Sequence, residues 1–101
     1  MKIICIGQNY LEHIKELSNV KSKEPLVFLK PDTALISKGR SFFIPNFSKE
    51  IHYELEVVIK IKKPGRYIER KYSNQYYDEI TVGIDFTARD LQKKLREKGL
   101  S

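Results

Sequence analysis

The chain has 101 residues, so we expect one ordinary domain or part of one rather than several domains. Hydrophobic residues make up 41% and charged residues 32%, with 5 Gly and 4 Pro. This composition excludes a collagen-like chain, a low-complexity chain and a chain that is disordered over its whole length. The net charge of +6 admits nucleic acid, an anionic membrane surface or small acidic molecules as partners, and does not choose among them.

The beginning of the chain bears on its location. No apolar run approaches the roughly 20 residues that cross a bilayer, and residues 2–6 are too short for a secretory signal. The one cysteine, Cys5, cannot form an internal disulfide and suits a small buried side chain in a reducing compartment. We therefore expect a cytoplasmic protein.

The amino-terminal part is predicted to contain two strands around a helix. The continuous apolar run over residues 2–6 predicts a strand buried on both faces. Asn9 then caps a short helix over residues 10–17, and residues 18–25 form a polar loop that ends in proline. Residues 26–29 predict the next strand.

The middle of the chain is predicted to be mostly β-structure. Residues 34–36 and 42–44 read as two short strands around a glycine turn. Over residues 51–61, apolar side chains at odd positions alternate with mainly polar ones at even positions, which predicts a strand with one apolar and one charged face. Residues 62–65 mark a turn, whereas residues 67–78 fit no single pattern, with a partial helix as one option.

The carboxyl-terminal part predicts a strand followed by a helix. Residues 80–86 form the apolar strand. Thr87 and Asp90, three residues apart, predict the start of a helix over residues 87–98, and Gly99 closes it. No internal repeat and no linker interrupt this order of elements.

Three carboxylates are the candidate metal ligands. Glu54 and Glu56 leave the same face of the predicted strand, about 6.5 to 7 Å apart at the backbone, although such a pair alone is commonly only an acidic surface. Asp85 lies in an apolar strand, so it must bond to a helix start, form an ion pair or coordinate a metal. Carboxylates without a His and Cys cluster favour Mg²⁺, Mn²⁺ or Ca²⁺ over zinc.

Two pairs at helical spacing are further candidates. His13 and Glu16 lie three residues apart, so the carboxylate can orient the imidazole as a general base. Arg89 and Gln92 have the same spacing, and the guanidinium can hold an anionic substrate group beside a metal. Taken alone, each pair is also a common feature of solvated helices.

Four segments stand out when the chain is read in order: CIGQNY at 5–10 with Glu12 and His13 after it, FLKP at 28–31, HYELE at 52–56, and GIDFTARDLQ at 83–92. Together they resemble the fumarylacetoacetate hydrolase family, in particular its acylpyruvate hydrolase and oxaloacetate decarboxylase branch. The resemblance covers essentially the whole chain. It implies an α+β domain with the family's mixed β-sheet roll, incomplete here, and two short helices.

The resemblance also implies roles for the candidate residues. Metal ligands for Mg²⁺, Mn²⁺ or Ca²⁺ would be Glu54, Glu56 and Asp85; substrate contacts would be Arg89 and Gln92; and a water-activating dyad on a mobile helix would be His13 and Glu16.

The implied activity is metal-assisted cleavage of a carbon–carbon bond in a 2-oxo acid or 1,3-diketone, such as an acylpyruvate or oxaloacetate. The metal would chelate the keto-carboxylate and stabilise the enolate, while His13, held by Glu16, deprotonates water; a decarboxylation would need only the metal. Neither nucleic acid nor a membrane is then an expected partner. The alternatives are a small basic module that binds nucleic acid through residues 60–71 and 93–98, and a non-catalytic remnant that keeps the metal site.

Two departures from the family pattern affect these expectations. Gln8 stands where members usually carry Arg. The family's domain also runs to about twice this length and continues after the equivalent of residues 98–100 with Pro-Trp and then a catalytic Lys. The chain therefore resembles the amino-terminal half of such an enzyme, and we expect a homodimer or a missing carboxyl-terminal half, with little activity from this chain alone.

Overall fold

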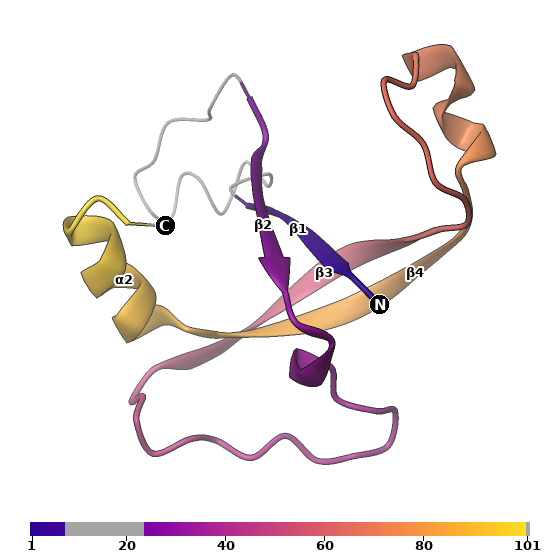
Figure 1. Cartoon of the computed structure of the whole chain (residues 1–101). Coiled ribbons are helices and arrows are strands. Elements are labelled where there is room, and N and C mark those ends of the chain that lie inside the picture. Colours follow the sequence, from indigo (N-terminus) through magenta and orange to yellow (C-terminus); the bar gives the residue numbers. More distant parts are fainter. Residues whose placement is uncertain (8–23, 101) are drawn as a thin grey trace. The chain divides into compact units, whose positions relative to one another are not determined.

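The computed structural model describes residues 1–7 and 24–100, which belong to two compact units, Met1–Phe43 and Ile44–Ser101. The first unit contains β1 (Ile3–Gly7), β2 (Leu26–Lys30) and the 3₁₀ helix η1 (Asp32–Ala34). The second contains β3 (Ile51–Ile61), the 3₁₀ helix η2 (Arg70–Gln75), β4 (Tyr77–Ala88) and α2 (Arg89–Glu97) (Figure 1). The helix predicted over residues 10–17 lies outside the described residues.

In the first unit, β1 and β2 pair antiparallel, from Ile3 opposite Lys30 to Gly7 opposite Leu26. Both predicted strands are thus confirmed to within a residue at their ends. The prediction that the first strand is buried on both faces is wrong, because Ile4 and Ile6 are 59% and 47% exposed. A continuous apolar run does not reveal whether one or both faces of a strand are covered.

The two short strands predicted at residues 34–36 and 42–44 are also absent. Ala34 belongs to η1, where its amide donates to the Pro31 carbonyl at 3.0 Å. Leu35 is extended but pairs with no strand of the described chain. Short apolar runs without strict alternation are weak evidence for a strand, since pairing also needs a free neighbouring edge.

The second unit is built on a long antiparallel ribbon of β3 and β4 (Figure 1). It runs from Ile51 opposite Ala88 to Ile61 opposite Tyr77. The bounds of β3 are those predicted from the alternation, whereas β4 extends beyond the predicted residues 80–86 at both ends. Near Lys60 the register shifts and leaves Asp78 as one additional residue in β4, which is a β-bulge.

The segment between β3 and β4 contains η2, in agreement with the option of a partial helix. We call this segment, residues 62–76, the excursion. The Lys62 amide donates to the Tyr76 carbonyl at 2.9 Å, and this hydrogen bond joins the two ends of the excursion. Figure 1 shows η2 at one end of the ribbon and α2 at the other. The excursion is therefore remote along the strands from the residues that precede α2.

Helix α2 begins two residues later than predicted. Thr87 belongs to β4, opposite His52, and the N-cap is Ala88, whose side chain forms no capping hydrogen bond. The predicted end at residue 98 is confirmed to within one residue, since α2 ends at Glu97. Gly99 has a φ of 73°, its amide donates to the Arg96 carbonyl, and the Leu100 amide donates to the Leu95 carbonyl. This is the closure in which glycine is favoured, because the backbone turns left-handed there.

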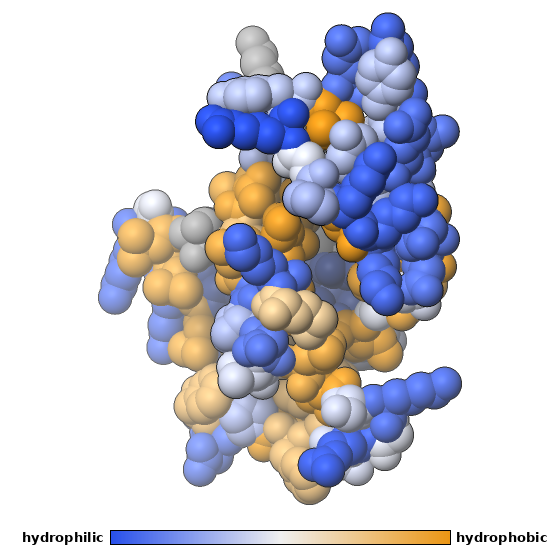
Figure 2. Space-filling model, turned by 45° about the vertical axis from the view of Figure 1, so that its right-hand side comes forward, coloured by the Kyte–Doolittle hydropathy of each residue, from blue (hydrophilic) through white to orange (hydrophobic). Residues whose placement is uncertain are grey.

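Few side chains are shielded from solvent. Among the described residues only Ser48 is buried, at 6% exposure, and Figure 2 shows apolar side chains (orange) uncovered at the surface. No helix in the described part of the chain is long and apolar enough to cross a membrane. The structure is thus a strand-rich α+β arrangement with few helices, and the complete roll remains a prediction.

Candidate metal centre

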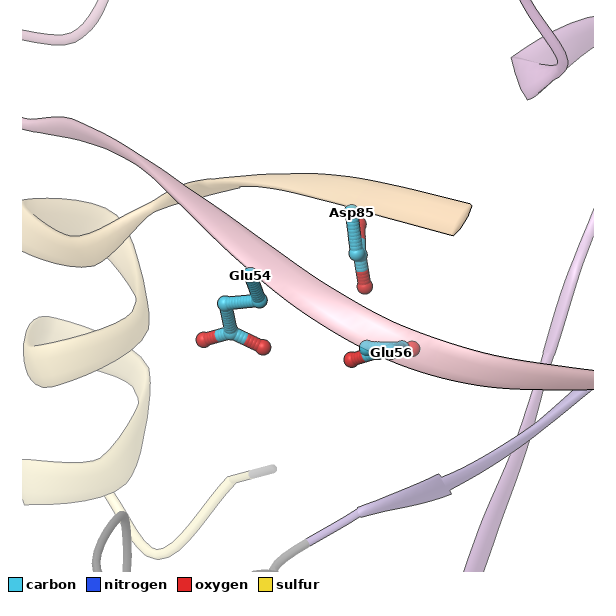
Figure 3. A group of neighbouring side chains, drawn as sticks. All are labelled: Glu54, Glu56 and Asp85. Atoms are coloured by element: carbon cyan, nitrogen blue, oxygen red, sulfur yellow. The ribbon is translucent and has the colours of Figure 1, made fainter. Parts of the chain in front are cut away.

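The register of the ribbon brings three carboxylates to one face. Glu54 lies directly opposite Asp85, and Glu56, two residues further along β3, lies opposite Gly83. Side chains directly opposite each other in a sheet share a face, as do those two residues apart. Figure 3 shows all three carboxylates on the same side of the ribbon, and one oxygen from each lies within 4.8 Å of the others.

This donor set suits a hard divalent cation. Two oxygens on opposite sides of Mg²⁺, Mn²⁺ or Ca²⁺ are separated by about 4 to 5 Å, since the individual bonds measure roughly 2.0 to 2.6 Å. The carboxylate oxygens of Glu54, Glu56 and Asp85 lie within 4.8 Å of one another, which is near enough for the three side chains to converge on one such cation. All three residues are half-buried, so their negative charges are screened by water less than those of an exposed cluster.

Gly83 keeps space open beside Glu56. It faces the same side as the carboxylates, and a Cβ atom there would lie 2.9 Å from Cγ2 of Val58. Contacts of that length essentially never occur, so any larger residue would push Val58 or the strand aside. From the sequence, Gly83 was expected only as part of the family motif at residues 83–92.

Arg89 neutralises part of the acidic cluster. Its Nη2 lies 2.9 Å from Oε1 of Glu54, and the side chains are only 11% and 18% exposed. The Arg89 amide also donates to the Glu50 carbonyl at 2.8 Å, which fixes the first residue of α2 beside the start of β3. Arg89 was predicted as a substrate contact, and the structure adds that it forms an ion pair with a candidate metal ligand.

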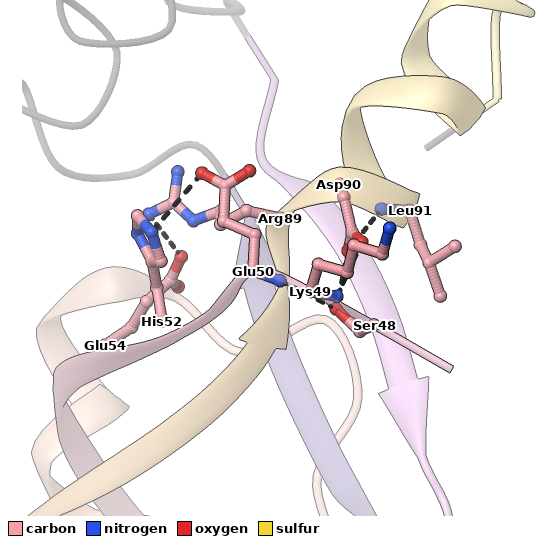
Figure 4. A network of polar contacts seen from close by, with 8 residues as sticks. All are labelled: Ser48, Lys49, Glu50, His52, Glu54, Arg89, Asp90 and Leu91. Atoms are coloured by element: carbon pink, nitrogen blue, oxygen red, sulfur yellow. Dashed lines mark hydrogen bonds and ion pairs between the residues drawn. The ribbon is translucent and has the colours of Figure 1, made fainter. Parts of the chain in front are cut away.

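Asp90 fastens α2 to the segment before β3 (Figure 4). Its Oδ1 accepts hydrogen bonds from the Ser48 hydroxyl at 2.6 Å and the Leu91 amide at 2.9 Å, and its Oδ2 accepts one from the Lys49 amide at 3.0 Å. The Ser48 hydroxyl, followed by the Lys49 amide, holds the pKa of Asp90 below its ordinary value. Asp90 was predicted as a helix-start residue, but its main partners lie more than forty residues earlier in the chain.

The other candidates fall in different places. Gln92 is half-buried in α2, three residues after Arg89 and hence on a similar side of that helix. His13 and Glu16 lie outside the described residues, so the proposed dyad stays a prediction. His52 was not among the predicted site residues, yet it shares the face of Glu54 and has its Nε2 3.4 Å from Oε1 of Glu50. Its parity with Glu54 and Glu56 was the available signal.

Comparisons with known proteins show which family the chain resembles over almost its whole length. The family model described as "Fumarylacetoacetate (FAA) hydrolase C-terminal" matches residues 2–100. Human "oxaloacetate tautomerase FAHD1, mitochondrial" is 34% identical over 98 residues, which are 97% of this chain and 44% of the relative. The protein of the same name from Arabidopsis thaliana is 36% identical over 99 residues, which are 98% of this chain and 44% of the relative.

Solved structures give the same result. A fumarylacetoacetate hydrolase family protein from Yersinia pestis CO92 superposes with a TM-score of 0.89 at 34% identity, over 99% of this chain and 46% of its own. The fumarylpyruvate hydrolase of Pseudomonas aeruginosa, in complex with Mn²⁺ and pyruvate, superposes with a TM-score of 0.86 at 32% identity, over 100% of this chain and 46% of its own. The chain therefore spans a little under half the length of these relatives.

Proposed function

The chain belongs to the fumarylacetoacetate hydrolase family, and we propose that it supplies the metal-binding part of an active site for small 2-oxo acids or 1,3-diketones. The observation that carries the proposal is the cluster of Glu54, Glu56 and Asp85 with Arg89 beside it. A cation and a guanidinium next to each other suit a substrate with a keto group and a carboxylate.

The chain's own residues would divide the work of binding. Glu54, Glu56 and Asp85 would hold Mg²⁺ or Mn²⁺, which when bound polarises a keto oxygen and stabilises negative charge that develops on it. Arg89 can turn part of its guanidinium toward a substrate carboxylate, since its Nε has no hydrogen-bond partner among the described residues. Gln92, three residues along α2, would donate a second hydrogen bond from its amide.

The first candidate reaction is cleavage of a carbon–carbon bond, as in an acylpyruvate hydrolase or oxaloacetate decarboxylase. There His13, oriented by Glu16, would take the proton of the attacking water. The second candidate is interconversion of the enol and keto forms of oxaloacetate, favoured by the 34% identity to human oxaloacetate tautomerase FAHD1. Both reactions pass through an enolate, so the same cation and guanidinium would serve either.

Cys5, the one cysteine, agrees with a reducing compartment, and we propose the cytoplasm.

Metal binding is the first test. Titration of the chain with Mn²⁺, followed by electron paramagnetic resonance, should show one tight site that Glu56→Gln weakens at least about tenfold. Glu79→Gln is the matched control, because Glu79 lies on the same ribbon but pairs with Lys60 at 3.7 Å, and it should change the affinity less than about twofold. Equal losses in the two variants, or no saturable site, would refute the metal assignment.

Ligand binding is the second test. Oxalate, a mimic of the enolate of a 2-oxo acid, should bind the Mn²⁺-loaded chain and not the chain in excess chelator. Mn²⁺ binding without oxalate binding would indicate a remnant that keeps only the metal site. Tighter binding of duplex DNA than of oxalate, with a steep loss on adding salt, would favour the basic nucleic-acid module instead.

A further inference from the structure

The ribbon of β3 and β4 carries an extended apolar face on the side opposite the carboxylates. We define this apolar face as the odd-numbered residues of β3 from Tyr53 to Ile59 and the even-numbered residues of β4 from Ile80 to Phe86. They stand opposite one another in register, so the four pairs share one side of the sheet. Their exposure runs from 38% at Phe86 to 75% at Tyr53.

An exposed surface of this kind is unusual for a finished domain. Single apolar side chains at a surface are normal, whereas eight that adjoin one another on one sheet face mark an interaction site. The ribbon is also a two-stranded sheet, and such a sheet has little independent stability in water. Both features indicate that further polypeptide packs on this face.

The family comparisons indicate which polypeptide covers this face. Nearly all of this chain superposes on relatives that are more than twice as long, with a TM-score of 0.89 for the Yersinia pestis protein. The same ribbon in those proteins therefore belongs to a chain with as many residues again. A second copy of this chain is a less suitable occupant, because each copy brings a net charge of +6 and two copies repel each other.

We propose that the apolar face is the docking surface for a polypeptide equivalent to the half of the family domain that this chain does not match. The two faces of the ribbon then have separate tasks, since the apolar face joins the two halves and the opposite face presents the carboxylates. This inference does not depend on the proposed reaction, because it concerns assembly alone.

The experiment supplies the other half in trans. The chain is co-expressed with the part of the Yersinia pestis relative that it does not match, and complexes are measured by size exclusion with light scattering. We expect a one-to-one complex. A stable monomer that ignores the added segment would overturn the proposal, as would a homodimer that excludes it.

Two variants of the same residue type distinguish the faces. Val57 and Val58 are neighbours in β3 that point to opposite sides, toward the apolar face and the carboxylate face respectively. Val57→Lys should weaken the complex at least about tenfold and Val58→Lys less than about threefold, because a lysine buried in an interface is costly. Equal weakening by both variants would place the contact elsewhere and overturn the proposal.

A measurement without variants covers the case in which Val57→Lys does not fold. Hydroxyl-radical labelling of the wild-type chain reports the exposure of Tyr53 and Leu55 directly. Both should be labelled less in the presence of the added segment, whereas His52 on the opposite face should keep at least about half of its labelling. Unchanged labelling of Tyr53 and Leu55 in a formed complex would overturn the proposal.

Discussion

Replacing Arg89 with methionine should change stability and metal affinity in opposite directions. At 2.9 Å, two unit charges in a medium with an effective dielectric constant of about 20 attract each other by about 6 kcal/mol. Desolvation of the two nearly buried groups offsets much of this attraction, so we expect the variant to lose about 2 to 3 kcal/mol of unfolding free energy in the absence of metal. Methionine keeps most of the side chain's volume, so the loss reports the charge rather than a cavity.

The metal affinity should rise, because Glu54 no longer shares its carboxylate with a cation. We expect Mn²⁺ to bind Arg89→Met about tenfold more tightly, and saturating Mn²⁺ to shrink the stability difference. Urea denaturation followed by circular dichroism measures the first quantity and calorimetric titration the second. Lys93→Met, on an exposed position of the same helix, should change stability by less than about 0.5 kcal/mol. An Arg89 variant that binds Mn²⁺ more weakly, or loses equal stability with and without it, would show that the reasoning is wrong.

Three further outcomes follow from the geometry. Because the pKa of Asp90 is lowered, its stabilising effect is complete above its ordinary value of 3.8 and is lost as the pH falls through the lower native value, so Asp90→Asn should remove this part of the acid sensitivity of the urea midpoint. Gly83→Val should lower Mn²⁺ affinity about tenfold in calorimetric titration, since its side chain would crowd Val58 beside Glu56, and an unchanged affinity would contradict this. The chain alone, with Mg²⁺ or Mn²⁺, should turn over acetylpyruvate or oxaloacetate more slowly than about 1 s⁻¹ by absorbance, because its exposed ribbon does not form a water-excluding site; faster turnover would refute this.

The parts of the fold that were predictable are those with a strong local pattern. The alternation of apolar and mainly polar residues predicted β3, and the glycine at position 99 predicted the end of α2 to within one residue. The start of α2 was misplaced because Thr87 continues the pairing of β4, and a cross-strand neighbour such as His52 leaves no local signal. The strands predicted at 34–36 and 42–44 failed for the related reason that strand formation depends on a partner elsewhere in the chain.

The candidate site was likewise predictable only where a local sequence pattern exists. Parity places Glu54 and Glu56 on one face, and the apolar surroundings of Asp85 marked it as unusual. Their approach to within 4.8 Å depends on the register between β3 and β4, and no local sequence pattern reveals that register because a long segment separates the two strands. The bonds from Ser48 to Asp90 and from Arg89 to Glu54 were likewise beyond a local pattern, because each joins residues more than thirty positions apart.

The bulge near Lys60 indicates where the ribbon accepts changes in length. Asp78 is accommodated there as an additional residue, at the end of the strands that adjoins η2. An additional residue between Gly83 and Asp85 would instead place these two positions on opposite faces, because successive side chains of a strand alternate. Evolution should therefore tolerate insertions and deletions around η2 while conserving the residue count from Gly83 to Ala88.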